Sequence, residues 1–147
     1  MGAFQEKKIT IRTEILEETE RGAILEIAFK GIHDHNWPHG RKIISFVTEE
    51  ILRIKPSAVL FNFLEYRYDF GNEIADPIMA ARFGREHHAP LPFAIVAQGI
   101  TSRSLKSLFR FSKLETVFKY GFFEAVVDGW AFLRNVLDQV EPLASPQ

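Results

Sequence analysis

The segment AVLFNFL at residues 58–64 decides how this chain folds. Its apolar residues run almost without interruption, which is typical of a strand buried on both faces of a sheet. A similar run, AILEIAF, stands upstream at residues 23–29. Between the two, Asn36 and Pro38 favour a helix start, and apolar residues follow at helical spacing at Ile43, Ile44, Val47, Ile51 and Ile54. A strand, a helix that ends near Lys55 and a second strand predict a right-handed crossover with parallel pairing.

The rest of the sequence extends this pattern in both directions. Ile9, Ile11 and Ile15 alternate with polar residues and predict a strand that forms an antiparallel hairpin with residues 23–29. Downstream, the pattern predicts a helix over residues 76–86, a strand at 93–97, a helix capped by Thr101 and Ser102, a strand at 116–118 and a last helix through Phe122, Val126, Trp130, Leu133 and Leu137.

These elements together predict an α/β fold. We expect a mixed β-sheet with an N-terminal antiparallel hairpin, then repeated βα crossovers, with about four helices in all. Residues 1–140 are expected to form a single domain, and residues 141–147 a frayed C-terminal tail.

Composition excludes several kinds of function. The 147 residues, 46% of them apolar, are enough to bury a core without disulfides or metal. The chain has no cysteine, which excludes a thiol nucleophile, a disulfide framework and cysteine-ligated zinc or iron–sulfur sites. A net charge of −1 argues against non-specific binding to nucleic acid. No run of about 18 apolar residues could span a bilayer, and the N-terminus lacks an apolar signal core, so we expect a cytoplasmic protein.

The order of the predicted elements resembles that of STAS domains, the fold of anti-sigma-factor antagonists. In that family a strand ending in Gly leads to a loop and helix, as residues 27–31 do here. The place of the family's Asp-Ser-Ser-Gly-type loop is taken by residues 69–72, Asp-Phe-Gly-Asn. The resemblance covers roughly residues 23–133 and includes the later positions Leu105, Leu108, Leu114, Val117, Phe118, Glu124 and Ala125.

The predicted loop departs from the family at the position of phosphorylation. Members that act as phosphorylation switches carry a hydroxyl just after the loop Asp, and this chain has Phe70 and Gly71 there. Neither residue can accept a phosphate. Phosphorylation therefore cannot add negative charge to a helix N-terminus at these positions. The resemblance therefore implies a module that is constitutive or regulated elsewhere.

A partner-binding surface is predicted where the central strand ends. Ligands of open α/β sheets bind at the carboxyl ends of the strands, and aromatic residues with Arg are enriched in interface hot spots. The candidate residues are Tyr66, Tyr68, Asp69, Phe70, Gly71, Asn72 and Asp76. The alternative is that the aromatic rings fill the core and that Asp69 and Asn72 only shape a turn. The resemblance implies a protein partner such as an anti-sigma factor or another kinase-like regulator, and exposed aromatic residues are compatible with a homodimer.

A basic stripe on the predicted helix after Thr101 is a second candidate. Lys and Arg recur there at three- and four-residue spacing, and a helix N-terminus presents unpaired N–H groups to an anion. The predicted anion-binding residues are Thr101, Ser102, Arg103, Lys106 and Arg110, with Lys113 continuing the stripe. The alternative is a solvated basic face. Small-molecule binding, of a lipid, a nucleotide or another anion, is the second function class.

The sequence favours neither a metal site nor an enzyme. His33, His35 and His39 could bring three nitrogens together, but no fourth ligand or general base is placed beside them, and solvated or capping histidines are the alternative. No Gly-x-Ser-x-Gly or nucleotide-binding glycine motif occurs. We therefore expect a non-enzymatic interaction module without a cofactor.

Overall fold

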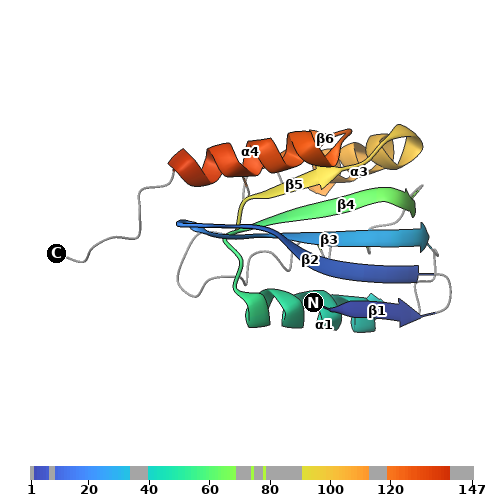
Figure 1. The fold of residues 1–147 in the computed structure, drawn as a ribbon. Coiled ribbons are helices and arrows are strands. Elements are labelled where there is room, and N and C mark those ends of the chain that lie inside the picture. The colour runs from blue at the N-terminus through green and yellow to red at the C-terminus, as the bar shows by residue number, and fades with distance from the viewer. Residues whose placement is uncertain are drawn as a thin grey trace.

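The structure is a computed structural model that describes residues 2–6, 9–33, 40–68, 74, 78, 91–112 and 119–139. Within these residues, six strands form one sheet in sequential order: β1 (Ala3–Glu6), β2 (Ile9–Thr19), β3 (Gly22–Ile32), β4 (Ala58–Arg67), β5 (Phe93–Val96) and β6 (Tyr120–Phe123) (Figure 1). The described helices are α1 (Gly40–Ile54), α3 (Gly99–Ser112) and α4 (Val126–Gln139). None of them is long and apolar enough to span a membrane.

The predicted hairpin and crossovers are present. β2 and β3 pair antiparallel, and β3, β4, β5 and β6 pair parallel in that order. At the hairpin turn the Thr19 hydroxyl accepts a hydrogen bond from the amide of Arg21 at 3.0 Å and donates one to the carbonyl of Gly22 at 2.9 Å. Gly22 has a φ of 117°, a conformation that favours glycine, so the turn is encoded locally. The α/β fold with a mixed sheet is thus confirmed.

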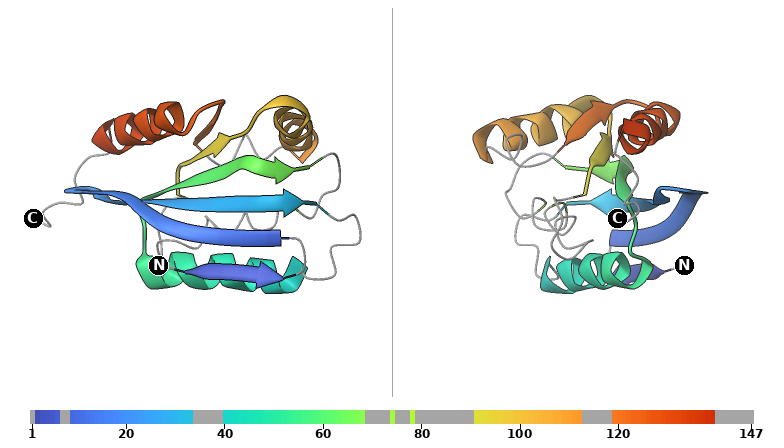
Figure 2. Two further views of the ribbon diagram at one scale, coloured as in Figure 1. Left: turned by 45° about the vertical axis from the view of Figure 1, so that its right-hand side comes forward. Right: turned by 90° about the vertical axis from the view of Figure 1, so that its left-hand side faces the viewer.

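The apolar residues of the parallel strands divide between the two faces of the sheet. In β4, Val59, Phe61 and Phe63 belong to a core with α1 and α3, whereas Ala58 and Leu60 belong to a second core with α4. α1 and α4 therefore cover opposite faces (Figure 1 and Figure 2). α4 approaches closely because Gly129 has no side chain: a Cβ there would lie only 3.1–3.3 Å from side-chain atoms of the sheet.

The structure differs from the sequence prediction at both edges of the sheet. β1 was not predicted; it pairs with β2 from Ala3↔Arg12 to Glu6↔Ile9 and is too short to show a periodic pattern. The strand beside β5 is Tyr120–Phe123, not residues 116–118, which lie outside the described residues. Phe122, assigned by its spacing to the last helix, is in this strand. The predicted helix over 76–86 also lies outside the described residues except at Ile78.

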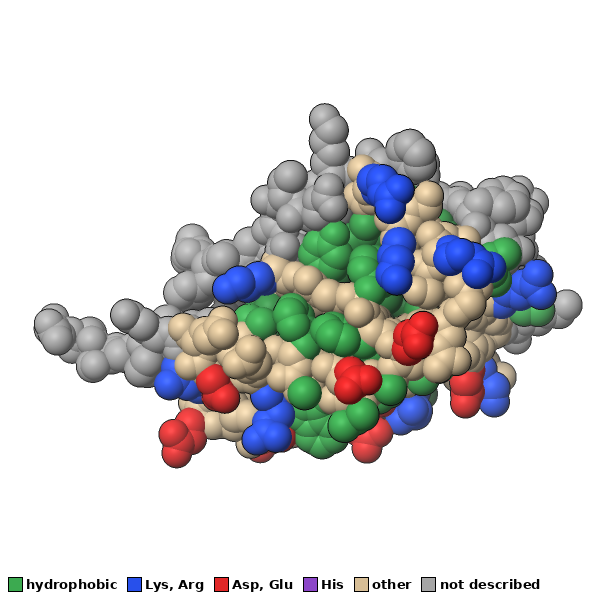
Figure 3. All heavy atoms as spheres, turned by 90° about the horizontal axis from the view of Figure 1, so that it is seen from above, with side chains coloured by type: hydrophobic (Ala, Val, Ile, Leu, Met, Phe, Trp, Pro, Cys, Tyr) green, Lys and Arg blue, Asp and Glu red, His purple; other side chains and the backbone are tan. Residues whose placement is uncertain are grey.

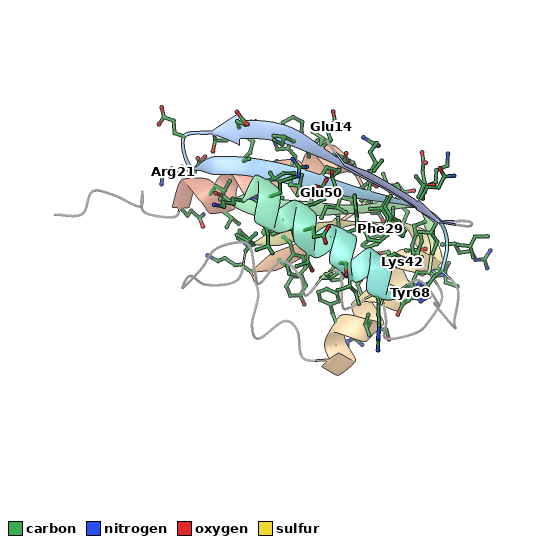
Figure 4. The ribbon with its side chains drawn as sticks, turned by 90° about the horizontal axis from the view of Figure 1, so that it is seen from below. Glu14, Arg21, Phe29, Lys42, Glu50 and Tyr68 are labelled. Atoms are coloured by element: carbon green, nitrogen blue, oxygen red, sulfur yellow. The ribbon has the colours of Figure 1, made fainter. Side chains whose placement is uncertain are left out.

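A buried polar cluster links α1 to the N-terminal strands. Glu50 of α1 accepts a hydrogen bond from the Thr13 hydroxyl at 2.6 Å, and Thr13 in turn accepts the amide of Gly2 at 2.9 Å. Arg53 donates to the other carboxylate oxygen of Glu50 from Nε at 3.0 Å and from Nη2 at 2.7 Å. Burial raises the pKa of Glu50, but these hydrogen bonds and the Arg53 charge lower it more, so its pKa lies below the ordinary 4.5. Figure 4 shows Glu50 on α1.

Glu50→Gln is expected to lower the free energy of unfolding at neutral pH. The pKa of Glu50 is lower in the folded than in the unfolded state, where it is near 4.5. Its charge therefore stabilises the fold at pH values above 4.5, and this contribution is lost as the pH falls through the pKa of the folded state. Urea titrations from pH 7 to pH 3 should therefore show the wild type more stable at pH 7 and the two proteins converging below pH 4.5.

The exposed neighbour Glu49 provides the control for this comparison. Glu49→Gln removes the same charge from α1 without touching Thr13 or Arg53, so its stability difference from the wild type should be small at every pH. A Glu50→Gln protein that tracks the wild type at pH 7 contradicts the assignment of the pH dependence to this cluster.

Candidate interaction surface

A groove of about 460 Å³ lies at the carboxyl ends of β3 and β4, beside the start of α3. The end of β3 contributes Lys30 and Ile32, and the end of β4 contributes Leu64 and Arg67. Gln98 and Thr101 close it on the α3 side. This is the end of the sheet at which the sequence predicted a partner-binding surface, and it is the usual ligand end of parallel sheets.

A β-bulge in β4 determines which side chains face this groove. Ala28 pairs with Asn62, but Lys30 pairs with Glu65, so β4 contains one residue more than β3 over this stretch. The Asn62 side-chain oxygen accepts the amide of Leu64 at 3.0 Å, and its side-chain nitrogen donates to Glu26 at 3.1 Å. At the bulge, Leu64 and Glu65 are both exposed. Each residue beyond them lies on the opposite face of the sheet from the one that regular alternation would give it.

The tyrosines beyond the bulge therefore belong to the core. Tyr66 is 3% exposed and Tyr68 2% exposed. The Tyr66 ring packs against Phe29 and Phe63 at centroid distances of 5.6 and 5.9 Å, and the Tyr68 ring lies 5.1 Å from that of His33. Figure 4 looks onto this layer from the α1 side, with Phe29 and Tyr68 labelled. The sequence left two interpretations of this aromatic run open, an interface and core packing. The structure places both tyrosine rings in the core.

The other predicted partner-binding residues, Asp69, Phe70, Gly71, Asn72 and Asp76, lie outside the described residues. In the sequence they come after β4, which ends at Arg67. Their part in binding stays a prediction.

His33, the first of the three candidate metal ligands, is also buried. Its Nδ1 lies 2.9 Å from the Tyr66 hydroxyl, and the residue is 6% exposed. His35 and His39 lie outside the described residues. In the part of the chain that the structure describes, no three metal-ligating side chains come together. His33 thus contributes to the packing beneath the groove.

Thr101 joins α3 to the end of β4. Its hydroxyl donates to the carbonyl of Tyr66 at 3.0 Å and accepts the amide of Tyr68 at 3.1 Å. α3 begins at Gly99, two residues earlier than predicted, and the amide of Ser102 already bonds to the carbonyl of Gln98 at 3.3 Å. Thr101 and Ser102 are therefore not in the capping positions that the anion-site prediction assumed, because a contact with β4 fixes the helix start.

The basic stripe occupies the exposed face of α3. Arg103, Lys106 and Arg110 are exposed, while Leu105, Leu108 and Phe109 face the core as their spacing predicted. The ammonium of Lys106 lies 5.7 Å from the ring centroid of Phe122, a cation–π contact that fixes its position. Lys113 lies outside the described residues. Binding of an anion by this stripe stays a prediction.

Large aliphatic side chains are exposed around the groove. Ile32 is 58% exposed, Leu64 40% and Ile100, at the start of α3, 42%. Figure 3 looks at the molecule from the side of α3 and α4 and shows Lys and Arg side chains gathered beside hydrophobic ones in its right-hand part. We call Ile32, Leu64 and Ile100 the apolar rim. An apolar rim with neighbouring cations can bind a protein surface through both area burial and charge.

Comparison with known proteins identifies the architecture. No family model and no curated protein matches the sequence. Among solved structures, the fold is similar to that of an anti-sigma factor antagonist from Mycobacterium paratuberculosis, with a TM-score of 0.59 and 15% sequence identity. The match covers 86% of this chain and 94% of that chain. At this identity the likeness establishes the fold, and the predicted STAS-type architecture is confirmed.

Proposed function

We propose that this chain is a non-enzymatic protein-interaction module of the STAS type, which acts in a regulatory or signalling assembly. The apolar rim at the carboxyl ends of the parallel strands is the observation that carries the proposal. The shared fold with an anti-sigma factor antagonist supports it, and an anti-sigma factor or another kinase-like regulator is the kind of partner that this likeness suggests.

The energetics favour a protein partner at this rim. Complete burial of one Ile or Leu side chain contributes about 1.5–3 kcal/mol to the free energy of binding. A side chain that is only partly exposed before binding contributes a fraction of this, in proportion to its exposed area. Ile32, Leu64 and Ile100 together can therefore supply the apolar centre of an interface. A stable interface buries about 800 Å² on each partner, so the contact also includes neighbouring residues, and residues 69–72 and Asp76 are the proposed extension.

The polar groups of the groove suit binding better than catalysis. The Thr101 hydroxyl is engaged by the backbone of β4, so it is not poised as a nucleophile. Glu65 forms an exposed ion pair with the ammonium of Lys30 at 3.9 Å across the two strands. With Phe70 and Gly71 in place of a hydroxyl, the proposed module binds its partner without phosphorylation at the usual loop position.

Leu64→Glu tests this proposal. We expect it to weaken partner binding by at least about tenfold, or about 1.4 kcal/mol, because it places a carboxylate in the apolar centre of the interface. The partner is first purified with the wild-type chain from native cells and identified by mass spectrometry. The dissociation constant is then measured by calorimetry with both proteins produced recombinantly.

Leu52→Glu is the matched control, since Leu52 is 50% exposed on α1, away from the groove. It makes the same chemical change and should leave affinity unaltered. Equal binding by wild type and Leu64→Glu, both folded by circular dichroism, removes the rim from the interface. No binding between the purified pair overturns the proposed interaction itself.

A further inference from the structure

The charge of this chain is distributed unevenly, and α3 is its basic element. Residues 99–112 contain Arg103, Lys106 and Arg110 and no acidic residue. The chain as a whole has a net charge of −1, so with +3 on α3 the remaining residues together carry −4. A local excess of this kind is a property of one surface and is invisible in the overall charge.

Several exposed cations on other elements are paired with carboxylates. Arg12 pairs with Glu14 at 2.9 Å, Arg53 with Glu50 at 2.7 Å and Arg134 with Glu17 at 3.1 Å. Among the described residues, Arg103, Lys106 and Arg110 have no carboxylate within ion-pair distance, and Lys106 instead contacts the face of Phe122. Within the described residues, three positive charges on one helix face are therefore not neutralised by a neighbouring carboxylate.

This basic face continues into the apolar rim. Ile100 and Arg103 are three residues apart on α3 and share one side of the helix. Thr101, between them, lines the same groove as Ile32 and Leu64. Figure 2 shows α3 beside the carboxyl end of β4, and Figure 3 shows cations next to apolar side chains on this side of the molecule. The surface thus combines an apolar strip with a row of cations.

We propose that this composite surface binds an acidic amphipathic segment of the partner protein. The apolar side chains of the segment cover the apolar rim, and its Asp and Glu side chains pair with Arg103, Lys106 and Arg110. This inference rests on the proposed function and specifies the chemistry of the partner.

Charge and composition favour a protein segment over a nucleic acid. Three cations on a chain of net charge −1 are few for a phosphate backbone, and the exposed Ile100 beside them offers nothing to a phosphate. The guanidinium of Arg, in contrast, matches a carboxylate in a two-pronged hydrogen bond. Oligonucleotide and vesicle binding are therefore the competing outcomes of the test.

The experiment measures fluorescence anisotropy of a labelled synthetic helical peptide with Leu on one face and Glu on the other. We expect binding to the wild type that weakens as salt is raised, and a loss of at least about tenfold in the double variant Arg103→Glu/Arg110→Glu. A peptide of the same composition in scrambled order, an oligothymidine and phosphatidylserine vesicles are measured in parallel, and each should bind more weakly.

Arg41→Glu/Lys55→Glu is the control, because both residues are exposed outside α3 and the net charge changes equally. It should retain peptide binding. No binding of the acidic peptide to the wild type, equal loss in both double variants, or stronger binding of the oligonucleotide or vesicles overturns the inference. With the recombinant partner, loss of affinity in Leu64→Glu but not in Arg103→Glu/Arg110→Glu overturns this inference alone and leaves the proposed function standing.

Discussion

Replacing Thr101 by Val is expected to lower the free energy of unfolding by at least about 2 kcal/mol, since two buried backbone groups lose their partner and each such loss costs about 1–3 kcal/mol. The Thr101 hydroxyl bonds to the carbonyl of Tyr66 at 3.0 Å and to the amide of Tyr68 at 3.1 Å. Val has nearly the same shape but cannot replace either bond. Because Thr101 is 5% exposed, water cannot readily take the place of its hydroxyl. Urea denaturation followed by circular dichroism measures the loss.

Thr101→Ser separates the hydrogen bonds from packing. It keeps the hydroxyl and removes one methyl group, so its cost should be near 1 kcal/mol. Ser102→Ala alters the neighbouring hydroxyl, which is not part of the two hydrogen bonds of the bridge, and should change stability little. If Val and Ser at position 101 are equally destabilising, the bridge between α3 and β4 is not held by the hydroxyl.

The hydrogen bonds of Thr101 to the end of β4 also show the limit of prediction from a local sequence pattern. Thr and Ser before an amphipathic stretch are typical helix caps, so the sequence predicted a cap and an anion site at these residues. In the structure the hydroxyl serves a strand that lies 33 to 35 residues away in the chain. A local propensity carries no information about such a partner, and the tertiary contact decided the role of the residue.

The aromatic run after the central strand illustrates the same limit. The nearly continuous apolar run of residues 58–64 correctly predicted a strand that is buried on both faces of the sheet, because alternate residues of a strand pack on opposite faces. One extra residue after Asn62 changes the phase, so Tyr66 and Tyr68 lie in the same core as Phe61 and Phe63. The only local signal was the polar Asn62 within an apolar run, whose side chain bonds to the amide of Leu64.

The order of strands and helices was predictable for the opposite reason. Each element rests on its own periodicity, and the rule for parallel connections then fixes how neighbouring elements pair. The edge strands β1 (AFQE) and β6 (YGFF) have only four residues each and, unlike the equally short β5 (FAIV), they include polar residues or glycine. They depend on pairing with β2 and β5, respectively. Sequence reasoning therefore found the centre of the sheet and missed its edges.

Phe93→Ala is expected to have the largest effect on stability, about 3–5 kcal/mol, because a large buried side chain is removed and the cavity does not collapse completely. Phe93 is fully buried in β5, and its ring lies 5.9 Å from that of Phe61, 6.0 Å from that of Phe109 and 5.4 Å from that of Tyr120. These rings come from β4, α3 and β6, so a single side chain couples three elements to β5.

This coupling links the core to the candidate interaction surface, because Phe109 holds the inner face of the helix whose outer face carries Arg103 and Arg110. In Phe93→Ala, amide hydrogen exchange should accelerate more in α3 and β6 than in the β2–β3 hairpin, since loss of the ring releases their shared contact. Phe93→Leu, which retains most of the volume, should cost markedly less. Uniform acceleration across all three regions contradicts this local coupling and indicates that Phe93 stabilises the molecule only as a whole.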